Sequence, residues 1–171
     1  MLQKLLPTFL AAIFIAIFAQ ITILLPYIPI TGQSFAVLLV AYLLGWNRGM
    51  IAVLLYLFVG AIGLPVFADG ASGIAKLKGN SGGFLYGFVV AAFVVGSLAE
   101  NTVPSTFKKA LGIMALGTAV ILFFGVMHLS IHIGFQKALQ YGLYPFIAGA
   151  VVKIVLGAAI GDYLKSKYDF A

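Results

Sequence analysis

The chain alternates apolar stretches with short segments rich in glycine, proline and charged residues. This pattern predicts six helices, at about Leu5–Leu25, Ser34–Gly45, Gly49–Ile62, Phe84–Leu98, Leu111–Met127 and Tyr144–Leu164. A transmembrane helix needs about 20 apolar residues. The second stretch would rise only about 18 Å at 1.5 Å per residue. It must therefore extend into its flanking segments or enter the membrane only part-way, where protein or water covers its backbone.

The composition decides in favour of a membrane environment. Of 171 residues, 63% are hydrophobic and only 8% are charged, and the mean hydropathy is +1.16. A soluble domain carries about 25% charged residues. We therefore predict an all-α integral membrane protein with six transmembrane helices, in one domain over residues 1–171. The first apolar stretch is too long for a typical signal peptide, so we interpret it as a retained helix.

The charges predict an orientation. Six helices place both termini on one side, together with the segments GWNRG and AENTVPSTFKKA. That side holds six cations, namely Lys4, Arg48, Lys108, Lys109, Lys165 and Lys167, whereas Lys76, Lys78 and Lys137 lie on the other. Positive loops stay inside, so we expect cytoplasmic termini. The net charge of +6 suits anionic membrane lipid and does not indicate nucleic-acid binding.

One charge stands in the middle of an apolar helix. Lys153 is the only charged residue of FIAGAVVKIVLGAAIG, residues 146–161, and a lysine at that depth costs about 2.5–3.5 kcal/mol. The residues one turn earlier, Ala150 and Gly149, give it no acidic partner. Asp69 would reach it only if its loop dips into the bundle. Lys153 either snorkels to the outer interface or lines a polar cavity and contacts a ligand, and we favour the cavity.

Other candidates lie near the segments expected to face outside. GLPVFADGASGIAKLKGNSGG, residues 63–83, is a loop of about 20 residues, and such long loops are usually functional or disordered. Gln33, Asn80 and Tyr86, with Tyr42 and Tyr56, are polar or amphipathic groups in or near these segments. Each of them has a structural interpretation beside a ligand-binding one.

No motif for catalysis is present. The chain has no Walker A sequence, no HExxH, no GxSxG and no cysteine, so we predict a protein that is not an enzyme and has no cofactor. His128 and His132 have the i, i+4 spacing of a metal pair. Because no third histidine or cysteine accompanies them, we predict no metal site.

The first helix carries small residues on one face. Ala12, Ala16 and Ala19 are spaced by four and three residues. Small side chains let helix backbones approach closely in lipid. The face either packs inside the bundle or docks to a partner membrane protein.

Several stretches together give a resemblance. AAIFIAIFAQI, PITGQSFAVLLVAYLLGWNRG, LLYLFVGAIGLPVFADGASG, GNSGGFLYGF and YPFIAGAVVKIVLG occur in this order. With them the chain resembles the BioY family, the biotin-binding S-components of energy-coupling-factor (ECF) vitamin transporters. The resemblance implies a six-helix S-component bundle with termini inside, and capture of the vitamin at the outer side. It also implies docking of the coupling subunit on Ala12 and Ala16.

One position departs from the family pattern. Family members commonly have Pro-Gly-Asp-x-x-Lys where this chain has alanine at 148 and at 150 before Lys153. The resemblance places that aspartate near the polar head of biotin. A buried unpaired N–H costs about 1–3 kcal/mol. Either Asn80, Asp69 or a backbone carbonyl replaces the aspartate, or the ligand has a less polar head, as lipoate has.

We therefore expect a substrate-binding subunit for biotin, or for lipoate or a similar acid, in the bacterial cell membrane. Transport would depend on an ECF transmembrane coupling subunit and its ATPases. A small intramembrane enzyme and a scaffold are the alternatives from other classes. The residues expected at the substrate are Lys153, Asn80, Tyr86, Gln33, Asp69, Gly83 and Ala150.

Overall fold

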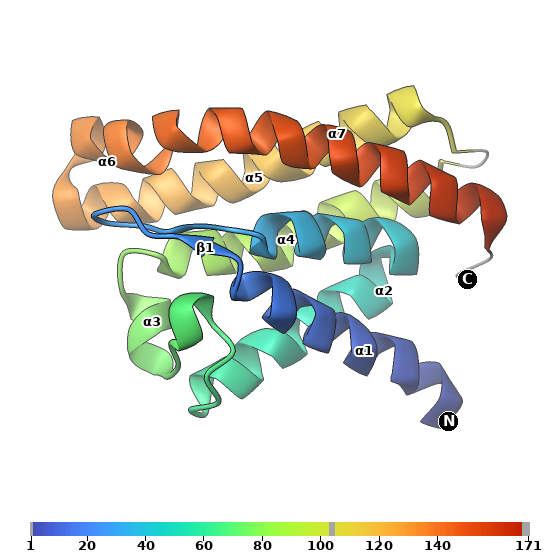
Figure 1. The fold of residues 1–171 in the computed structure, drawn as a ribbon, viewed down its shortest axis with the longest axis horizontal. Helices are drawn as coiled ribbons and strands as arrows, with labels where there is room; N and C mark the ends of the chain where they lie inside the picture. The colour runs from blue at the N-terminus through green and yellow to red at the C-terminus, as the bar shows by residue number, and fades with distance from the viewer. Residues whose placement is uncertain (1, 103–104, 169–171) are drawn as a thin grey trace.

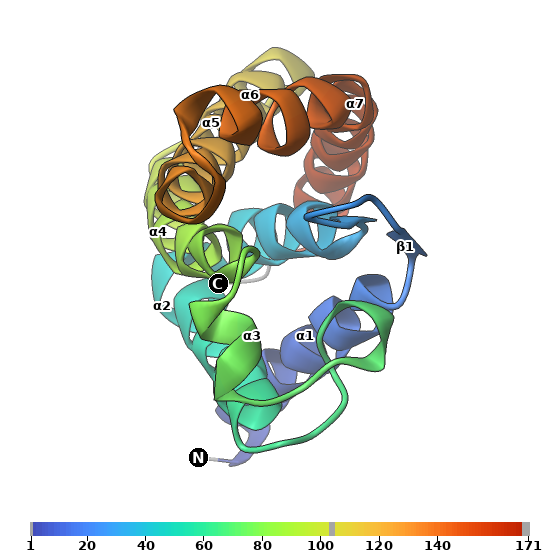
Figure 2. The ribbon, with the colours of Figure 1, turned by 90° about the vertical axis from the view of Figure 1, so that its left-hand side faces the viewer.

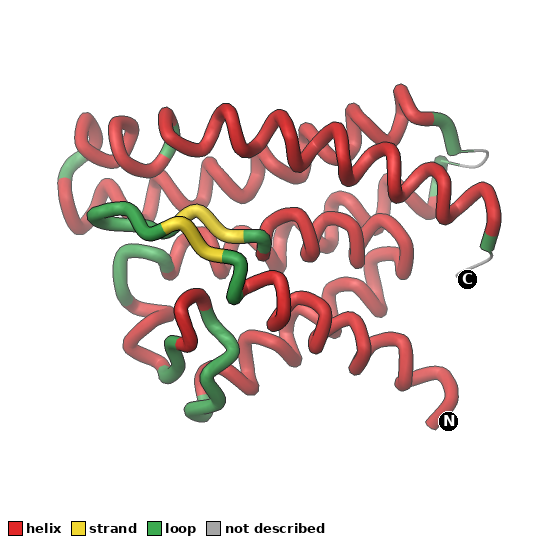
Figure 3. The backbone as a smooth tube through the Cα atoms, viewed as in Figure 1, coloured by secondary structure: helices red, strands yellow, loops and turns green. Residues whose placement is uncertain are grey.

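The protein is a bundle of helices, with one small hairpin near one end. The computed structural model describes residues 2–102 and 105–168, with the side chains of 2–5 left out. Its elements, in chain order, are α1 (Leu2–Ala19), β1 (Thr22–Ile23), β2 (Ile30–Thr31), α2 (Gln33–Ala61), the 3₁₀ turn η1 (Ala68–Gly70), α3 (Ile74–Lys78), α4 (Gly82–Glu100), α5 (Phe107–Ile133), α6 (Phe135–Gly142) and α7 (Tyr144–Lys167) (Figures 1 and 3).

Helix α2 consists of two arms that meet at Gly45. Gly45 has φ 77° and ψ 179°, a backbone conformation that side chains with a Cβ rarely adopt. The Glu100 carboxylate accepts a hydrogen bond from the Trp46 N–H at 3.2 Å. A Cβ at Gly45 would lie 2.0 Å from the same carboxylate oxygen. The chain can therefore reverse here only at a glycine.

The predicted count of six membrane helices is confirmed. The six are α1, the two arms of α2, α4, α5 and α7. Within the described residues, four stretches are long and apolar enough to cross a membrane: Gln33–Ala61, Gly82–Glu100, Phe107–Ile133 and Phe135–Lys167, and Leu6–Ala19 is a shorter apolar helix. The first arm of α2 is short, as expected, and the β1–β2 hairpin precedes it.

The two ends of the bundle differ in character. The start of α1, the Gly45 turn, the end of α4, the start of α5 and the end of α7 lie at one end (Figure 1). The hairpin, η1, α3 and the junction of α5 with α6 lie at the other, which faces the viewer in Figure 2. The irregular segments thus gather at a single end, hereafter the loop end, as the sequence predicted.

Two connections differ from the prediction. The first helix stops at Ala19 and does not reach Leu25, because residues 22–23 pair with residues 30–31, with Thr22 opposite Thr31. The Thr22 hydroxyl closes the helix end by donating to the Ala19 carbonyl at 2.8 Å. The connection after Met127 is helical: α5 runs on to Ile133, Gly134 breaks it at φ 83°, and α6 follows.

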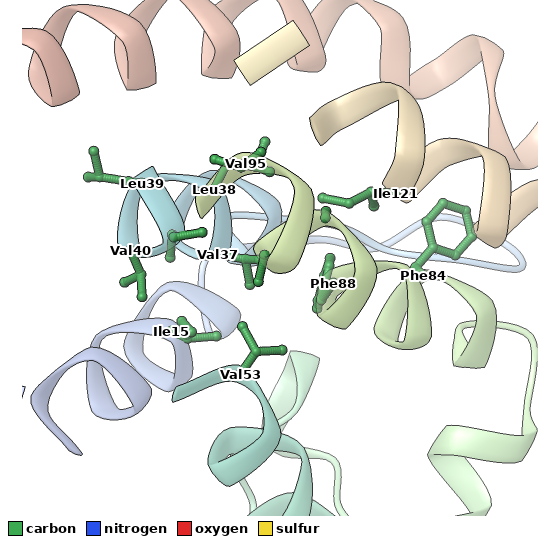
Figure 4. Packing of buried hydrophobic residues seen from close by; sticks show 14 of the residues in the cluster. Ile15, Val37, Leu38, Leu39, Val40, Val53, Phe84, Phe88, Val95 and Ile121 are labelled. Atoms are coloured by element: carbon green, nitrogen blue, oxygen red, sulfur yellow. The ribbon is translucent and has the colours of Figure 1, made fainter. Parts of the chain in front are cut away.

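The core lies where α1, α2, α4 and α5 meet. Ile15, Val37, Val53, Phe88 and Ile121 point into it from these elements (Figure 4). Helix α7 packs beside this core but turns much of its surface outward. Many of its exposed side chains are apolar, among them Ile147, Val151, Val152, Val155 and Leu156. An apolar outer surface suits contact with lipid chains.

Candidate functional site

A cavity opens at the loop end of the bundle. The unfilled space between its walls amounts to about 750 Å³ when the open mouth is included. The hairpin, the first arm of α2, the Phe67–Ala68 segment at the start of η1, α4, α5 and α7 form its walls, and α3 contributes Lys76. Its lining residues are Ile28, Pro29, Thr31, Gln33, Ser34, Leu38, Phe67, Ala68, Lys76, Ser81, Phe84, Leu85, Phe88, Thr118, Ile121, Leu122, Phe146, Ala150 and Lys153.

Lys153 reaches the cavity wall from the middle of α7. Its ammonium donates to the Thr31 carbonyl and to the Ser34 hydroxyl at 3.1 Å. Neither partner is an acid, so the positive charge is hydrogen-bonded but not neutralised. Hydrogen bonds to a charged group contribute about 1.5–3 kcal/mol, which offsets part of the cost of holding the lysine at this depth. The ammonium faces protein and not lipid.

Gln33 is held beside this lysine. Its amide nitrogen donates to the Tyr56 hydroxyl, and its amide oxygen accepts a hydrogen bond from the Thr31 hydroxyl at 3.1 Å. Tyr56 in turn meets the edge of Phe67, with ring centroids 5.6 Å apart. The polar region of the wall, Thr31, Gln33, Ser34 and Lys153, is therefore fixed by its own hydrogen bonds.

The rest of the wall is apolar and aromatic. Phe84 of α4 and Phe146 of α7 stack with centroids 5.5 Å apart and planes 18° apart. Phe88, Leu85 and Ile121 continue this surface. An apolar slot with polar groups in one region has the character of a site for an amphipathic small molecule.

The structure brings together three of the seven predicted substrate residues. Lys153, Gln33 and Ala150 all line the cavity. Ala150 leaves space in the wall where a longer side chain would enter. Their contact with a ligand stays a prediction.

The other four lie outside the wall. The Tyr86 hydroxyl donates to the Leu77 carbonyl at 2.9 Å, and Gly83 packs so closely on α5 that a Cβ would lie 2.3 Å from that of His128. Asp69 is exposed in η1, and Asn80 directly precedes the lining residue Ser81. Binding roles for these four also stay predictions, and the present arrangement does not favour them.

Tyr42 and the two histidines, which the sequence also singled out, contact other side chains of the protein. The Tyr42 hydroxyl lies 2.6 Å from that of Ser105, which donates to the Asp162 carboxylate at 2.6 Å, far along α7 from Lys153. His128 and His132 contact each other through their Nε2 atoms at 3.3 Å. Within residues 2–102 and 105–168, no third ligand-type side chain completes a metal cluster with them.

Several lining residues escaped the sequence prediction. Thr31, Ser34, Lys76, Ser81 and Thr118 all line the cavity. Ser34 and Lys153 are 119 positions apart, so no local spacing joins them. One signal in the sequence could have pointed to Thr31 and Ser34. Both lie within two positions of Gln33, in a segment that we expected at the outer face.

The face of α1 that carries the small residues packs partly against other helices of the bundle. Ala12 is buried in the core, and Ala16 is half-buried at its margin. Phe9, Ile13 and Ile17 form the exposed face of α1. Docking through Ala12 and Ala16 stays a prediction, and of the two Ala16 offers the more open surface.

Comparison with known proteins agrees with this geometry. The family model described as "BioY family" matches residues 2–170. A biotin transporter BioY of Thermotoga maritima is 40% identical over 151 residues, covering 88% of this chain and 89% of that protein. Another, of Rhizobium etli, is 38% identical over 167 residues, covering 89% of each. The chain belongs to the BioY family.

A solved structure extends this assignment to the fold. The BioY-family chain superposes on a crystal structure of the S-component for biotin from an ECF-type ABC transporter with a TM-score of 0.87. The identity is 26%, and the match covers 99% of this chain and 94% of the other. This BioY-family protein therefore has the S-component fold and is a multi-pass membrane protein, and the resemblance seen in its sequence is confirmed.

Proposed function

We propose that this chain is the membrane-embedded substrate-binding subunit of an ECF-type uptake transporter, and that its substrate is biotin. The observation that carries the proposal is the cavity itself. It has an aromatic slot beside the hydrogen-bonded Lys153, in a chain that matches an S-component for biotin over nearly its whole length. We propose that the chain binds and has no catalytic activity of its own.

The cavity offers acceptors that can replace the family aspartate. The ureido ring of biotin has two N–H donors, each of which needs an acceptor once buried. The Gln33 amide oxygen and the hydroxyls of Ser34, Ser81 and Thr118 lie in the wall. The Thr118 hydroxyl donates its proton to the Met114 carbonyl at 2.9 Å, so its lone pairs remain for a ligand. These acceptors support biotin as the substrate, although Ala150 stands where the family commonly has an aspartate.

Lipoate is the second candidate. Its dithiolane ring has no N–H group, and the Phe84–Phe146 stack is a suitable apolar surface for sulfur. Titration of the purified protein with both acids separates the two candidates. We expect biotin to bind at least about 10-fold more tightly, because its two N–H groups find acceptor oxygens in the wall and the dithiolane ring of lipoate has no donor for them. Tighter binding of lipoate would reassign the substrate, and no binding of either acid would overturn the subunit role.

We further propose that the termini face the cytoplasm and the loop end faces outside. A cysteine replacing Lys78, exposed on α3, should be labelled in intact cells by a thiol reagent that cannot cross the membrane. A cysteine replacing Lys108, exposed near the start of α5, should be labelled only after permeabilisation. The chain has no native cysteine, so the background is low. The reverse pattern would place the cavity on the cytoplasmic side.

The remaining partners follow from this role. We propose that energy for uptake comes from a separate ECF coupling subunit and its ATPases, because the chain has no nucleotide-binding motif. The exposed face of α1 is our candidate surface for that subunit, and the rest of the apolar exterior contacts lipid.

A further inference from the structure

Gln20, the first residue after α1, makes an unusual set of contacts. Its amide nitrogen donates to the Phe67 carbonyl at 3.2 Å, more weakly to the Val66 carbonyl at 3.4 Å, and to the Ala16 carbonyl of its own helix at 3.2 Å. Its amide oxygen accepts a hydrogen bond from the Gly70 N–H at 3.1 Å. One side chain thus binds both sides of η1 to the end of α1.

The segment that Gln20 holds is part of the cavity wall. Phe67 and Ala68 line the cavity and are almost fully buried. Phe67 also meets the edge of Tyr56, the hydrogen-bond partner of Gln33. A shift of this segment would therefore move one wall directly and loosen the packing beside the polar region.

The backbone of this turn needs support. Asp69 has φ 59°, the left-handed conformation, which is unfavourable for a residue with a side chain. Within the segment, the Phe67 N–H donates to the Ala71 carbonyl at 3.0 Å, and the Gly73 N–H ties the segment to the Gly60 carbonyl of α2 at 2.7 Å. Gln20 supplies the corresponding tie to α1. Without it, the turn keeps one anchor and loses the other.

We propose that Gln20 is a positioning residue that holds the Phe67–Ala68 wall closed over the cavity and so sets how long a bound ligand stays. The effect on the ligand rests on the proposed function. The effect on the wall does not, because it concerns the protein without ligand.

The wall is tested with a single cysteine at Ala68 in the ligand-free purified protein. The cysteine is buried when the wall is closed, so its labelling rate measures how often the wall opens. In the Gln20→Leu background, which keeps the side-chain bulk and removes the amide, we expect labelling about 10-fold faster or more, from the loss of at least two hydrogen bonds. The matched control is Thr22→Val, which removes a hydrogen bond at the same helix end that does not reach the wall.

A second cysteine, at the buried Ala110 of α5, reports on the whole fold. The proposal expects its labelling to stay unchanged in Gln20→Leu. If both cysteines react faster by the same factor, Gln20 stabilises the bundle in general and the proposal is wrong. It is equally wrong if labelling at position 68 does not change.

The ligand effect is measured separately. We expect Gln20→Leu to release biotin about 10-fold faster, with a much smaller change in association rate. Faster labelling with unchanged biotin release would refute the link to residence time. If the wild-type chain fails to bind biotin at all, the proposed function falls, while the labelling experiment still decides the role of Gln20.

Discussion

Replacing Lys153 with methionine should weaken biotin binding about 10- to 150-fold. Methionine keeps the apolar stem but removes the charge and three hydrogen-bond donors. A hydrogen bond to a charged group contributes about 1.5–3 kcal/mol, and each 1.4 kcal/mol is tenfold in affinity. Because Lys153 already lies in the wall with its charge not neutralised by its two oxygen partners, an oxygen of the ligand is its natural further partner. Titration of the purified variant measures the loss.

A control separates the ligand contact from the tether to the hairpin. Ser34→Ala removes one protein partner of the ammonium and one neutral acceptor from the wall, but it leaves the charge in the cavity. Because a hydrogen bond to a charged group contributes more than a neutral one, this variant should lose less affinity than Lys153→Met. Thermal unfolding without ligand shows whether either variant is misfolded. If Lys153→Met binds biotin as tightly as the wild type, the lysine only ties α7 to the hairpin and has no role at the substrate.

The neighbouring position extends this test. Ala150 lines the cavity one helical turn before Lys153, so an aspartate there would meet the ammonium as an i, i+3 pair. In Ala150→Asp we expect biotin affinity to hold or rise and lipoate affinity to fall, because a buried carboxylate suits two N–H donors and not a dithiolane ring. Weaker biotin binding would mean that the wall hydroxyls already fill the role of the family aspartate and leave no room for it.

The fold was largely predictable because lipid imposes a simple rule. Backbone groups inside a bilayer must be hydrogen-bonded within the protein, so apolar stretches become helices, and all six were found. The errors fell at the loop end, where that rule no longer applies. Residues 22–23 pair with residues 30–31, partners that are nine and seven positions apart. The segment after Met127 stays helical until Gly134 permits a break.

The site was less predictable, for a different physical reason. Lys153 could be found because a charge in an apolar helix is costly wherever its partners lie. Ser34 and Thr118 are ordinary residues until the fold brings them to the same wall. Tyr86 and Gly83 belong to the right segment, but their places on α4 direct them towards the loop segment and α5. Gln20 gave no signal, since its partners are backbone groups that every residue has.

We expect the second large effect from a substitution on the surface of α1, and we expect it on uptake, not on binding. Ala16 is half-buried at the margin of the exposed face formed by Phe9, Ile13 and Ile17, and a small residue there lets another helix approach closely. Ala16→Trp should therefore abolish energised biotin uptake in cells that contain the coupling subunit and ATPases. Binding by the purified variant should remain, because the side chain does not line the cavity.

The structure makes Ala16 a better test than Ala12. Ala12 is buried in the core, so a tryptophan there would overpack the bundle and lose uptake through misfolding. Val152→Trp is the matched control, because that residue is exposed on α7 and added bulk there meets only lipid. If Ala16→Trp keeps full uptake, this face does not dock the coupling subunit. If it loses biotin binding in the purified state, Ala16 serves internal packing, and the docking surface must be sought elsewhere on the exterior.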